Sequence, residues 1–245
     1  MSETHESRMP CPTCLGTDAV IIRNGPHAGV HCAVDDTWLY WAPKVELGEE
    51  PEPRSRQREW LYKGYWFRSL AEARWASFFD HVGWKWTVEP FNTGGYVPDF
   101  LILGRRPMVV EVKGKAASIE ELSELTEYVY PKLLGEWDKD ILCLGSKPLR
   151  IDDKYVGDSQ IGILSEWYGD DGWGNGEAIF CHCPSWTDCG CTRYGIGHSS
   201  GSYSLRPNSC YDGNLNLVEE SQIEELWALA TNATRWIPSR KAETR

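Results

Sequence analysis

The segment from Phe67 to Lys115 constrains the fold of this 245-residue chain more than any other. Apolar residues recur at helical spacing from Ala71 to Val82, which predicts a helix with one buried face, and Gly83 is a suitable stop. Three strand-like runs separated by turn-forming residues follow, at 84–91, 96–103 and 108–113. The segment therefore predicts a mixed α/β domain that begins with a helix and three strands joined by tight turns.

Four polar side chains fall at defined places in these elements. Glu72 lies in the first helical turn, Asp99 follows Pro98 in the second strand, and Glu111 and Lys113 share one face of the third strand. Because the last two strands form a tight hairpin, we expect the Asp99 carboxylate to reach Glu111. Two carboxylates this close repel each other unless a cation lies between them, and hard oxygen ligands select Mg²⁺ or Mn²⁺. Such a metal polarises a phosphate oxygen and lowers the pKa of a bound water, which Lys113 would orient.

The sequence Pro98-Asp99 followed by Glu111-Val112-Lys113 resembles the signature of the PD-(D/E)XK nuclease superfamily. The resemblance covers roughly residues 67–145. It implies an α/β (α+β) fold of the restriction-endonuclease-like type, with an αβββαβ core and a mixed sheet. It also implies a metal-dependent DNA nuclease that hydrolyses phosphodiester bonds, endonuclease or exonuclease, with Mg²⁺ or Mn²⁺ as cofactor and DNA as partner.

The resemblance implies a role for each residue of the signature. Asp99 and Glu111 bind the metal, helped by the backbone carbonyl of Val112, and Lys113 is the catalytic lysine. Glu72 is an accessory metal ligand, direct or through water. Glu72 also completes the S-x-x-E pattern of a helix capping box, so a purely structural role stays open for it.

The charge of the chain is unevenly distributed. The net charge is −11, but residues 54–115 carry 11 Lys and Arg against 6 Asp and Glu, a local charge of +5. Within this segment the candidate nucleic-acid contacts are Arg68, Arg105, Arg106 and Lys115. A basic surface on an acidic protein is compatible with binding to a phosphate backbone and predicts strong salt dependence, although ordinary surface charge would give the same count.

The nine cysteines are clustered, which favours metal ligation over disulfides. The spacing near the N-terminus predicts a small zinc ribbon whose ligands are Cys11, Cys14, Cys32 and Asp35. Aspartate is unusual in structural zinc sites, so His31 and His27 are alternative fourth ligands. A second cluster predicts another structural zinc, and its candidate ligands are Cys181, Cys183, Cys189, Cys191, Cys210 and His198. One or two structural Zn²⁺ ions are therefore expected.

These features divide the chain into five predicted parts. They are a zinc-ribbon-like module at 9–43, a linker at 44–58, a nuclease core at 59–168, a Cys/His-rich zinc-binding insertion at 169–215, and a helix at 216–240 that packs on the core. No apolar run is long enough to span a membrane, so we expect a cytoplasmic protein. The size suits a stand-alone nuclease encoded by a phage or mobile element, and a homodimer is possible.

Two other functions stay open from the sequence. The chain could be a zinc-stabilised nucleic-acid-binding protein whose nuclease fold is inactive, or an acidic protein-interaction factor that acts on DNA-processing machinery. The intact set of three acids and one lysine argues against the first alternative. The net charge of −11 gives weak support to the second.

Overall fold

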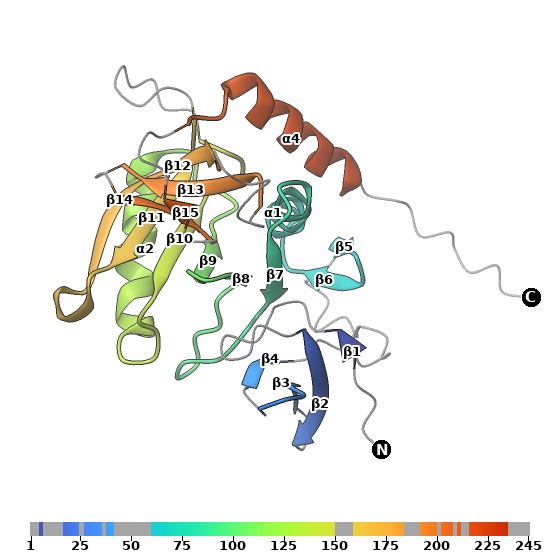
Figure 1. Cartoon of the computed structure of the whole chain (residues 1–245). Helices are drawn as coiled ribbons and strands as arrows, with labels where there is room; N and C mark the ends of the chain where they lie inside the picture. The colour runs from blue at the N-terminus through green and yellow to red at the C-terminus, as the bar shows by residue number, and fades with distance from the viewer. Residues whose placement is uncertain are drawn as a thin grey trace, which may run out of the picture.

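The computed structural model describes the chain in several ranges: 5–6, 17–24, 27–35, 38–41, 60–149, 159–183, 192–199, 202–207, 210–211 and 216–234. The described helices are α1 (Leu70–His81), α2 (Ile119–Leu133), α4 (Glu220–Ala233) and the 3₁₀ helix η1 (Gly169–Asp171). They accompany a large mixed sheet, so the chain belongs to the mixed α/β class that the sequence predicts (Figure 1). Within the described ranges, no helix combines the length and apolar character needed to cross a membrane.

Nine strands form the large sheet, in the order β15-β14-β13-β12-β11-β10-β9-β8-β7. Along the chain they are β7 (Lys85–Val88), β8 (Phe100–Leu103), β9 (Met108–Val112), β10 (Asp140–Leu144), β11 (Gln160–Trp167), β12 (Trp173–His182), β13 (Tyr194–His198), β14 (Ser202–Arg206) and β15 (Cys210–Tyr211). Only β9 and β10 pair in parallel, because α2 carries the chain from the end of one back to the start of the other. The order α1-β7-β8-β9-α2-β10 is the αβββαβ order expected from the sequence.

Two smaller sheets precede α1. One contains β1 (His5–Glu6), β2 (Asp18–Asn24), β3 (His27–Cys32) and β4 (Trp38–Trp41). The other is the hairpin of β5 (Trp60–Tyr62) and β6 (Tyr65–Phe67), which leads directly into α1. The β2–β3–β4 meander lies within the segment 9–43 that the sequence assigns to a zinc-ribbon-like module.

The segment 169–215 differs most from the expectation. Its described strands, β12 to β15, extend the large sheet instead of forming a separate module, and β11 is therefore an interior strand and not an edge. Side chains alternate along β12: Ala178 and Phe180 pack in the main core, whereas Ile179 and Cys181 pack on the other side. This period-two pattern identifies a strand, although the sequence was assigned to a zinc-binding insertion because Cys181 belongs to the cysteine cluster.

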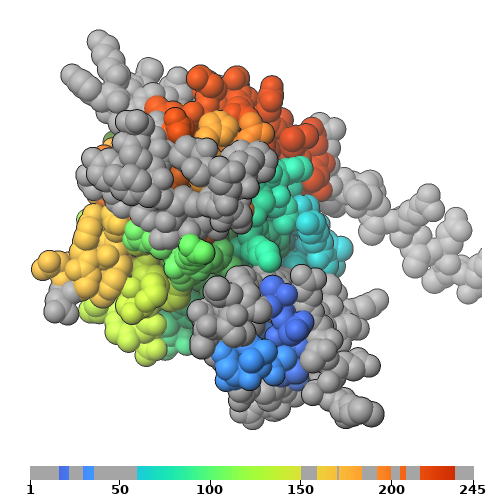
Figure 2. Space-filling view, viewed as in Figure 1, coloured from blue at the N-terminus to red at the C-terminus, as the bar shows by residue number. Residues whose placement is uncertain are grey.

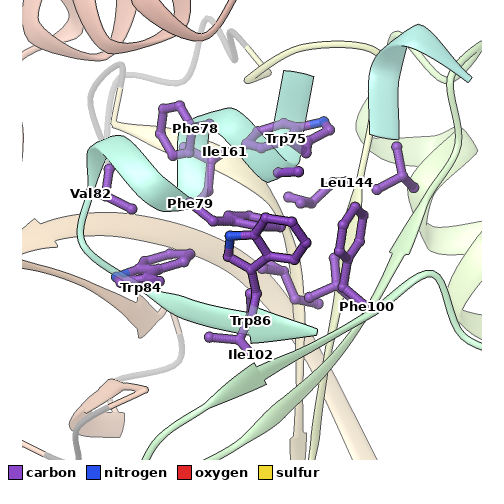
Figure 3. Packing of buried hydrophobic residues seen from close by; sticks show 14 of the residues in the cluster. Trp75, Phe78, Phe79, Val82, Trp84, Trp86, Phe100, Ile102, Leu144 and Ile161 are labelled. Atoms are coloured by element: carbon purple, nitrogen blue, oxygen red, sulfur yellow. The ribbon is translucent and has the colours of Figure 1, made fainter. Parts of the chain in front are cut away.

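The hydrophobic core lies on both faces of the sheet. α1 and α4 cover one face, where a cluster of buried aromatic side chains fills the space beneath α1 (Figure 3). Figure 2 shows α4, in red, directly beside the teal surface of α1, and Trp227 of α4 packs on Trp75 with ring centroids 4.8 Å apart. α2 covers the opposite face with Leu122, Leu125 and Val129. The central strands β9 to β11 therefore lie between α1 and α4 on one face and α2 on the other.

Candidate active site

The three candidate acids meet at one end of the large sheet. Asp99 directly precedes β8 and Glu111 lies in β9; because Phe100 pairs with Val110, the next pair outward is Asp99 with Glu111. Residues directly opposite each other in an antiparallel pair have side chains on the same side. A Cβ atom built on Gly114 would lie 3.4 Å from the Cβ of Ala71, so the turn after β9 packs on the first turn of α1.

Asp99 is the buried centre of the cluster, with only 5% of its surface exposed. One carboxylate oxygen accepts a hydrogen bond from the backbone N–H of Val112 at 2.8 Å. The other oxygen forms an ion pair with the guanidinium of Arg68. The backbone contact fixes Asp99 to β9, and the ion pair connects it to the residue just before the cap of α1.

Glu72 takes part both in helix capping and in the acid cluster. Ser69 is the N-cap of α1, and its Oγ accepts a hydrogen bond from the backbone N–H of Glu72 at 3.1 Å. The Glu72 carboxylate accepts from the backbone N–H of Arg68 at 3.1 Å and lies 4.0 Å from the Arg68 Nε. The Glu72 side chain therefore turns toward Arg68, which also contacts Asp99. A role in helix capping is thus compatible with a place in the acid cluster.

Glu111 is held by a tyrosine from the loop between β7 and β8. The Tyr96 hydroxyl donates a hydrogen bond to Glu111 Oε2 at 2.7 Å. The Tyr96 backbone pairs with Thr93, whose Oγ1 donates to the carbonyl of Lys132 in α2 at 2.8 Å. Helix α2 thus supports the loop that orients Glu111.

Burial raises the pKa of all three carboxyl groups, and repulsion from a neighbouring carboxylate adds to it. Burial, followed by the charge of Asp99, raises the pKa of Glu72 to about 7 and that of Glu111 to about 7. Burial also raises the pKa of Asp99, against the opposing effects of the Val112 N–H and Arg68. The charge of Glu89 adds to this repulsion. Carboxyl groups with raised pKa values are a frequent property of catalytic and cation-binding sites.

Three basic side chains surround this end of the sheet. Lys113 and Lys115 are exposed in the turn after β9, and the Arg68 side chain is 47% exposed. The site therefore has buried acids in its interior and exposed cations at its rim. This arrangement would suit a phosphate group that approaches from solvent.

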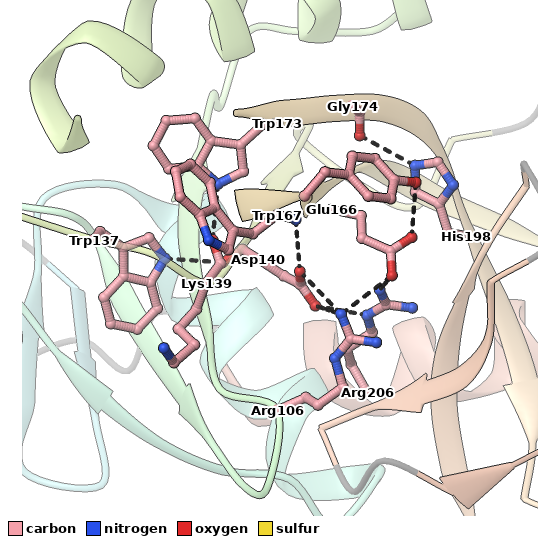
Figure 4. A network of polar contacts seen from close by, with 11 residues as sticks. Arg106, Trp137, Lys139, Asp140, Glu166, Trp167, Trp173, Gly174, His198 and Arg206 are labelled. Carbon is pink, nitrogen blue, oxygen red and sulfur yellow. Dashed lines mark hydrogen bonds and ion pairs between the residues drawn. The ribbon is translucent and has the colours of Figure 1, made fainter. Parts of the chain in front are cut away.

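Arg105 and Arg106 do not belong to this rim. They lie in the turn between β8 and β9, at the opposite end of the sheet, and Arg106 pairs with Asp140 at 3.0 Å and Glu166 at 3.2 Å (Figure 4). Arg106, a predicted nucleic-acid contact, is therefore paired with two buried carboxylates and lies away from the acid cluster. The turn that joins β8 and β9 lies one strand length away from the open end of this hairpin, where Asp99 and Glu111 meet.

The donor chemistry of the cluster fits a hard divalent cation. Asp99 and Glu111, with the carbonyl of Val112 and with Glu72 as a further ligand, supply oxygen atoms only. Among the described residues, no three acidic, imidazole or thiol groups already stand close enough together to hold a metal ion. The existing contacts explain this spacing, since Arg68 and Tyr96 hold Asp99 and Glu111 in interactions that a bound metal would replace.

The cysteine clusters are only partly described. Cys32 is buried and its Sγ accepts from the backbone N–H of Val34 at 3.4 Å, whereas Asp35 is exposed. Cys11 and Cys14 lie outside the described residues, as do Cys189 and Cys191. The N-terminal zinc prediction therefore stays a prediction.

Cys181 and Cys183 are buried on one side of β12, as the C-x-C spacing predicts. Cys210 pairs through its backbone with Leu205, a member of the same cluster. His198 is a different case, because β13 places it opposite Ala178, on the other face of β12 from Cys181. Its Nε2 lies 3.2 Å from the carbonyl of Gly174 (Figure 4), so its proposed role as a zinc ligand does not agree with the structure.

Sequence reasoning missed three contributors to the site. Arg68 was expected to contact DNA only, yet it pairs with Asp99; Tyr96 and Glu89 were not identified at all. Glu89 adopts a positive φ of 45°, which is uncommon for a residue other than glycine, and its backbone N–H donates to the Asp99 carbonyl at 3.0 Å. The position of Arg68 directly before the Ser69 cap was the one signal that could have placed it beside Glu72.

Comparisons with protein-family models, curated proteins and solved structures find no match to this chain. Functional inference therefore depends on the geometry and chemistry of the cluster.

Proposed function

We propose that this protein is a Mg²⁺- or Mn²⁺-dependent DNA nuclease of the PD-(D/E)XK type. The observation that carries the proposal is the meeting of Asp99 and Glu111 on one side of the β8–β9 hairpin, beside Glu72 of α1. Lys113 follows Glu111 by two residues at the same end of the sheet and is exposed to solvent. The αβββαβ order of α1 to β10 supports the assignment to this superfamily.

Each residue of the cluster has a defined task in this proposal. Asp99 and Glu111 would hold the cation, with the Val112 carbonyl and Glu72 as further ligands. When bound, the metal would polarise a phosphate oxygen and promote ionisation of a water. Lys113 would orient the attacking water and stabilise charge that develops on the phosphate. Tyr96 would keep Glu111 in its orientation through the 2.7 Å hydrogen bond.

The test is nuclease activity on linear, circular and branched DNA with Mg²⁺, Mn²⁺ or EDTA. We expect metal-dependent cleavage that falls at least about a hundredfold in Glu111→Ala, Asp99→Ala and Lys113→Ala, because each removes a group that acts on the reacting phosphate. Glu127→Ala is the matched control, since Glu127 is an exposed acid on α2. Circular dichroism shows whether each variant is folded, and the substrate pattern separates endonuclease from exonuclease activity.

The same experiment judges the alternative functions. Salt-dependent DNA binding without cleavage by folded protein would favour a binding protein with an inactive nuclease fold. Absence of both DNA binding and cleavage would favour an acidic interaction factor. A structural zinc that uses Cys181 and Cys183 stays part of the proposal, and zinc content measured in the same preparation, beside Cys183→Ser, tests it.

A further inference from the structure

Arg68 faces two environments at once. On its buried side, the guanidinium pairs with Asp99 and lies 4.0 Å from Glu72. On its other side, 47% of the side chain is exposed to solvent, at the rim that also carries Lys113. Arg68 is therefore the cation that offsets the repulsion among the acids, and it is also positioned to meet an incoming anion.

A divalent cation that binds the Asp99 oxygen contacted by Arg68 would compete with the guanidinium for that oxygen. The inner oxygen already accepts from the Val112 N–H, and Asp99 is 5% exposed, so the carboxylate has little room to offer other lone pairs. Two cations held by the same carboxylate also repel each other. Binding of a metal would thus release the guanidinium at the solvent-facing rim. Its planar N–H groups match the oxygens of a phosphate there.

We propose that Arg68 is an exchangeable counter-ion, which pairs with Asp99 and Glu72 without metal and transfers to a DNA phosphate when a divalent cation binds. This inference rests on the proposed nuclease function. It assigns Arg68 two successive partners, and it predicts opposite effects of its removal. Loss of the guanidinium should strengthen metal binding and lower kcat/KM for DNA cleavage.

The first measurement is Mn²⁺ binding to the full-length protein without DNA, by isothermal titration calorimetry at pH 8, where the Glu72 and Glu111 carboxyl groups with pKa of about 7 are ionised. Arg68→Gln should bind Mn²⁺ on the order of three- to tenfold more tightly than the unmodified chain, since the competing charge is absent. Arg68→Lys keeps a cation and should lie near the unmodified value. Lys63→Gln is the matched control, because Lys63 pairs with the acid Asp80 at an exposed site.

The second measurement is the salt dependence of Mn²⁺-supported kcat/KM for DNA cleavage. Arg68→Gln should lower kcat/KM and reduce the slope of log(kcat/KM) against log salt by about one, which corresponds to one lost phosphate contact. Arg68→Lys should retain the slope.

The outcomes separate the two hypotheses. If the unmodified protein cleaves DNA but Arg68→Gln binds Mn²⁺ no more tightly, or keeps the unmodified salt slope, the exchange is wrong and the nuclease assignment stands. If the unmodified protein neither binds Mn²⁺ nor cleaves DNA, both are wrong. Tighter Mn²⁺ binding together with slower, less salt-sensitive cleavage supports the exchange.

Discussion

Three acids, Glu72, Asp99 and Glu111, lie close together in a largely buried cluster. Arg68 offsets only part of their repulsion, because its guanidinium contacts Asp99 and approaches Glu72, whereas Glu111 depends on a neutral donor, Tyr96. Such an arrangement lowers stability whenever all three carboxyl groups are ionised.

Because ionisation of the three acids lowers stability, the free energy of unfolding of the metal-free protein should depend on pH. The folded-state pKa of Glu111, about 7, lies above its ordinary value of 4.5, so between these values the folded chain binds more protons than the unfolded chain. The free energy of unfolding should therefore fall as pH rises from about 5 to 8, by about 1–3 kcal/mol more than in Glu111→Gln. Urea unfolding in EDTA at pH 5, 6.5 and 8 measures this difference.

The control for this prediction is Glu127→Gln, which removes an exposed acid from α2 and should leave the pH dependence unchanged. Parallel curves for Glu111→Gln and the unmodified chain would contradict the prediction.

At the residue scale, the sequence was informative where strand geometry fixes a side chain. Asp99 and Glu111 could be brought together from the length of a tight hairpin alone, and Val112 could be assigned to the core from alternation. Tyr96 could not be placed in this way. It lies in an irregular loop before β8, and the direction of its ring depends on the contact of Thr93 with α2, a partner distant in sequence.

At the scale of elements, α1 carries the site and α4 keeps α1 in place. The buried face of α1 packs on the sheet through Phe78 and Phe79 (Figure 3). α4 packs on α1 through buried Ile223 and Leu226 and through Trp227, whose ring contacts Phe78. Because Ser69 and Glu72 stand at the start of α1, any shift of this helix would move Glu72 relative to Asp99. The C-terminal helix therefore supports the acid cluster, although none of its described residues is a member of that cluster.

Two leucines of α4 test this role with one substitution. Leu226 is buried, with 9% of its surface exposed, whereas Leu229 is 50% exposed. Leu226→Ala should cost about 2–4 kcal/mol of unfolding free energy because it leaves a cavity against α1. Leu229→Ala should change the free energy of unfolding by less than about 0.5 kcal/mol. Both variants replace leucine by alanine in the same helix, so the change in helix propensity is the same in the two. Urea unfolding of both variants decides the matter; equal effects would mean that α4 does not pack on α1 in this way.

The elements of the core were predictable because they have strong periodicity. The helix at 71–82 and the strands around residues 100 and 110 agree with the structure to within a few residues. The C-terminal helix, Glu220–Ala233, lies inside the predicted segment 216–240. Helix α2 contains Pro131 and continues two residues past it, although proline disfavours a helix interior. The strands β12 to β15 were missed because glycines interrupt β12 and β13, β14 and β15 are short, and the pairing that makes them strands is nonlocal.

At the scale of the whole molecule, the sheet separates two groups of buried charges. The acid cluster occupies the end where β9 finishes. At the other end, Arg206 pairs with Asp140 at 2.7 Å and with Glu166 at 2.6 Å, and all three are buried (Figure 4). Arg206 comes from β14, whereas Asp140 and Glu166 come from β10 and β11. This second group therefore joins the β12–β15 extension to the core.

Loss of Arg206 should destabilise the fold without altering the acid cluster. Arg206→Met leaves two buried carboxylates with Arg106 as their cation, and it should cost about 3–5 kcal/mol of unfolding free energy. Arg105→Met, in the neighbouring exposed turn, should change stability by less than about 0.5 kcal/mol. Well below its unfolding midpoint, Arg206→Met should retain the Mn²⁺ affinity of the unmodified chain; a large loss of affinity would show that the two ends are coupled.

The short outer strands of the large sheet have a consequence for self-association. β7 has four residues and β15 has two, so each edge offers few backbone groups to a strand from another copy. Edges of this length resist edge-to-edge aggregation. In the part of the chain that the structure describes, a dimer that cuts both strands of a duplex would therefore have to assemble through helices or loops, and not by extension of this sheet.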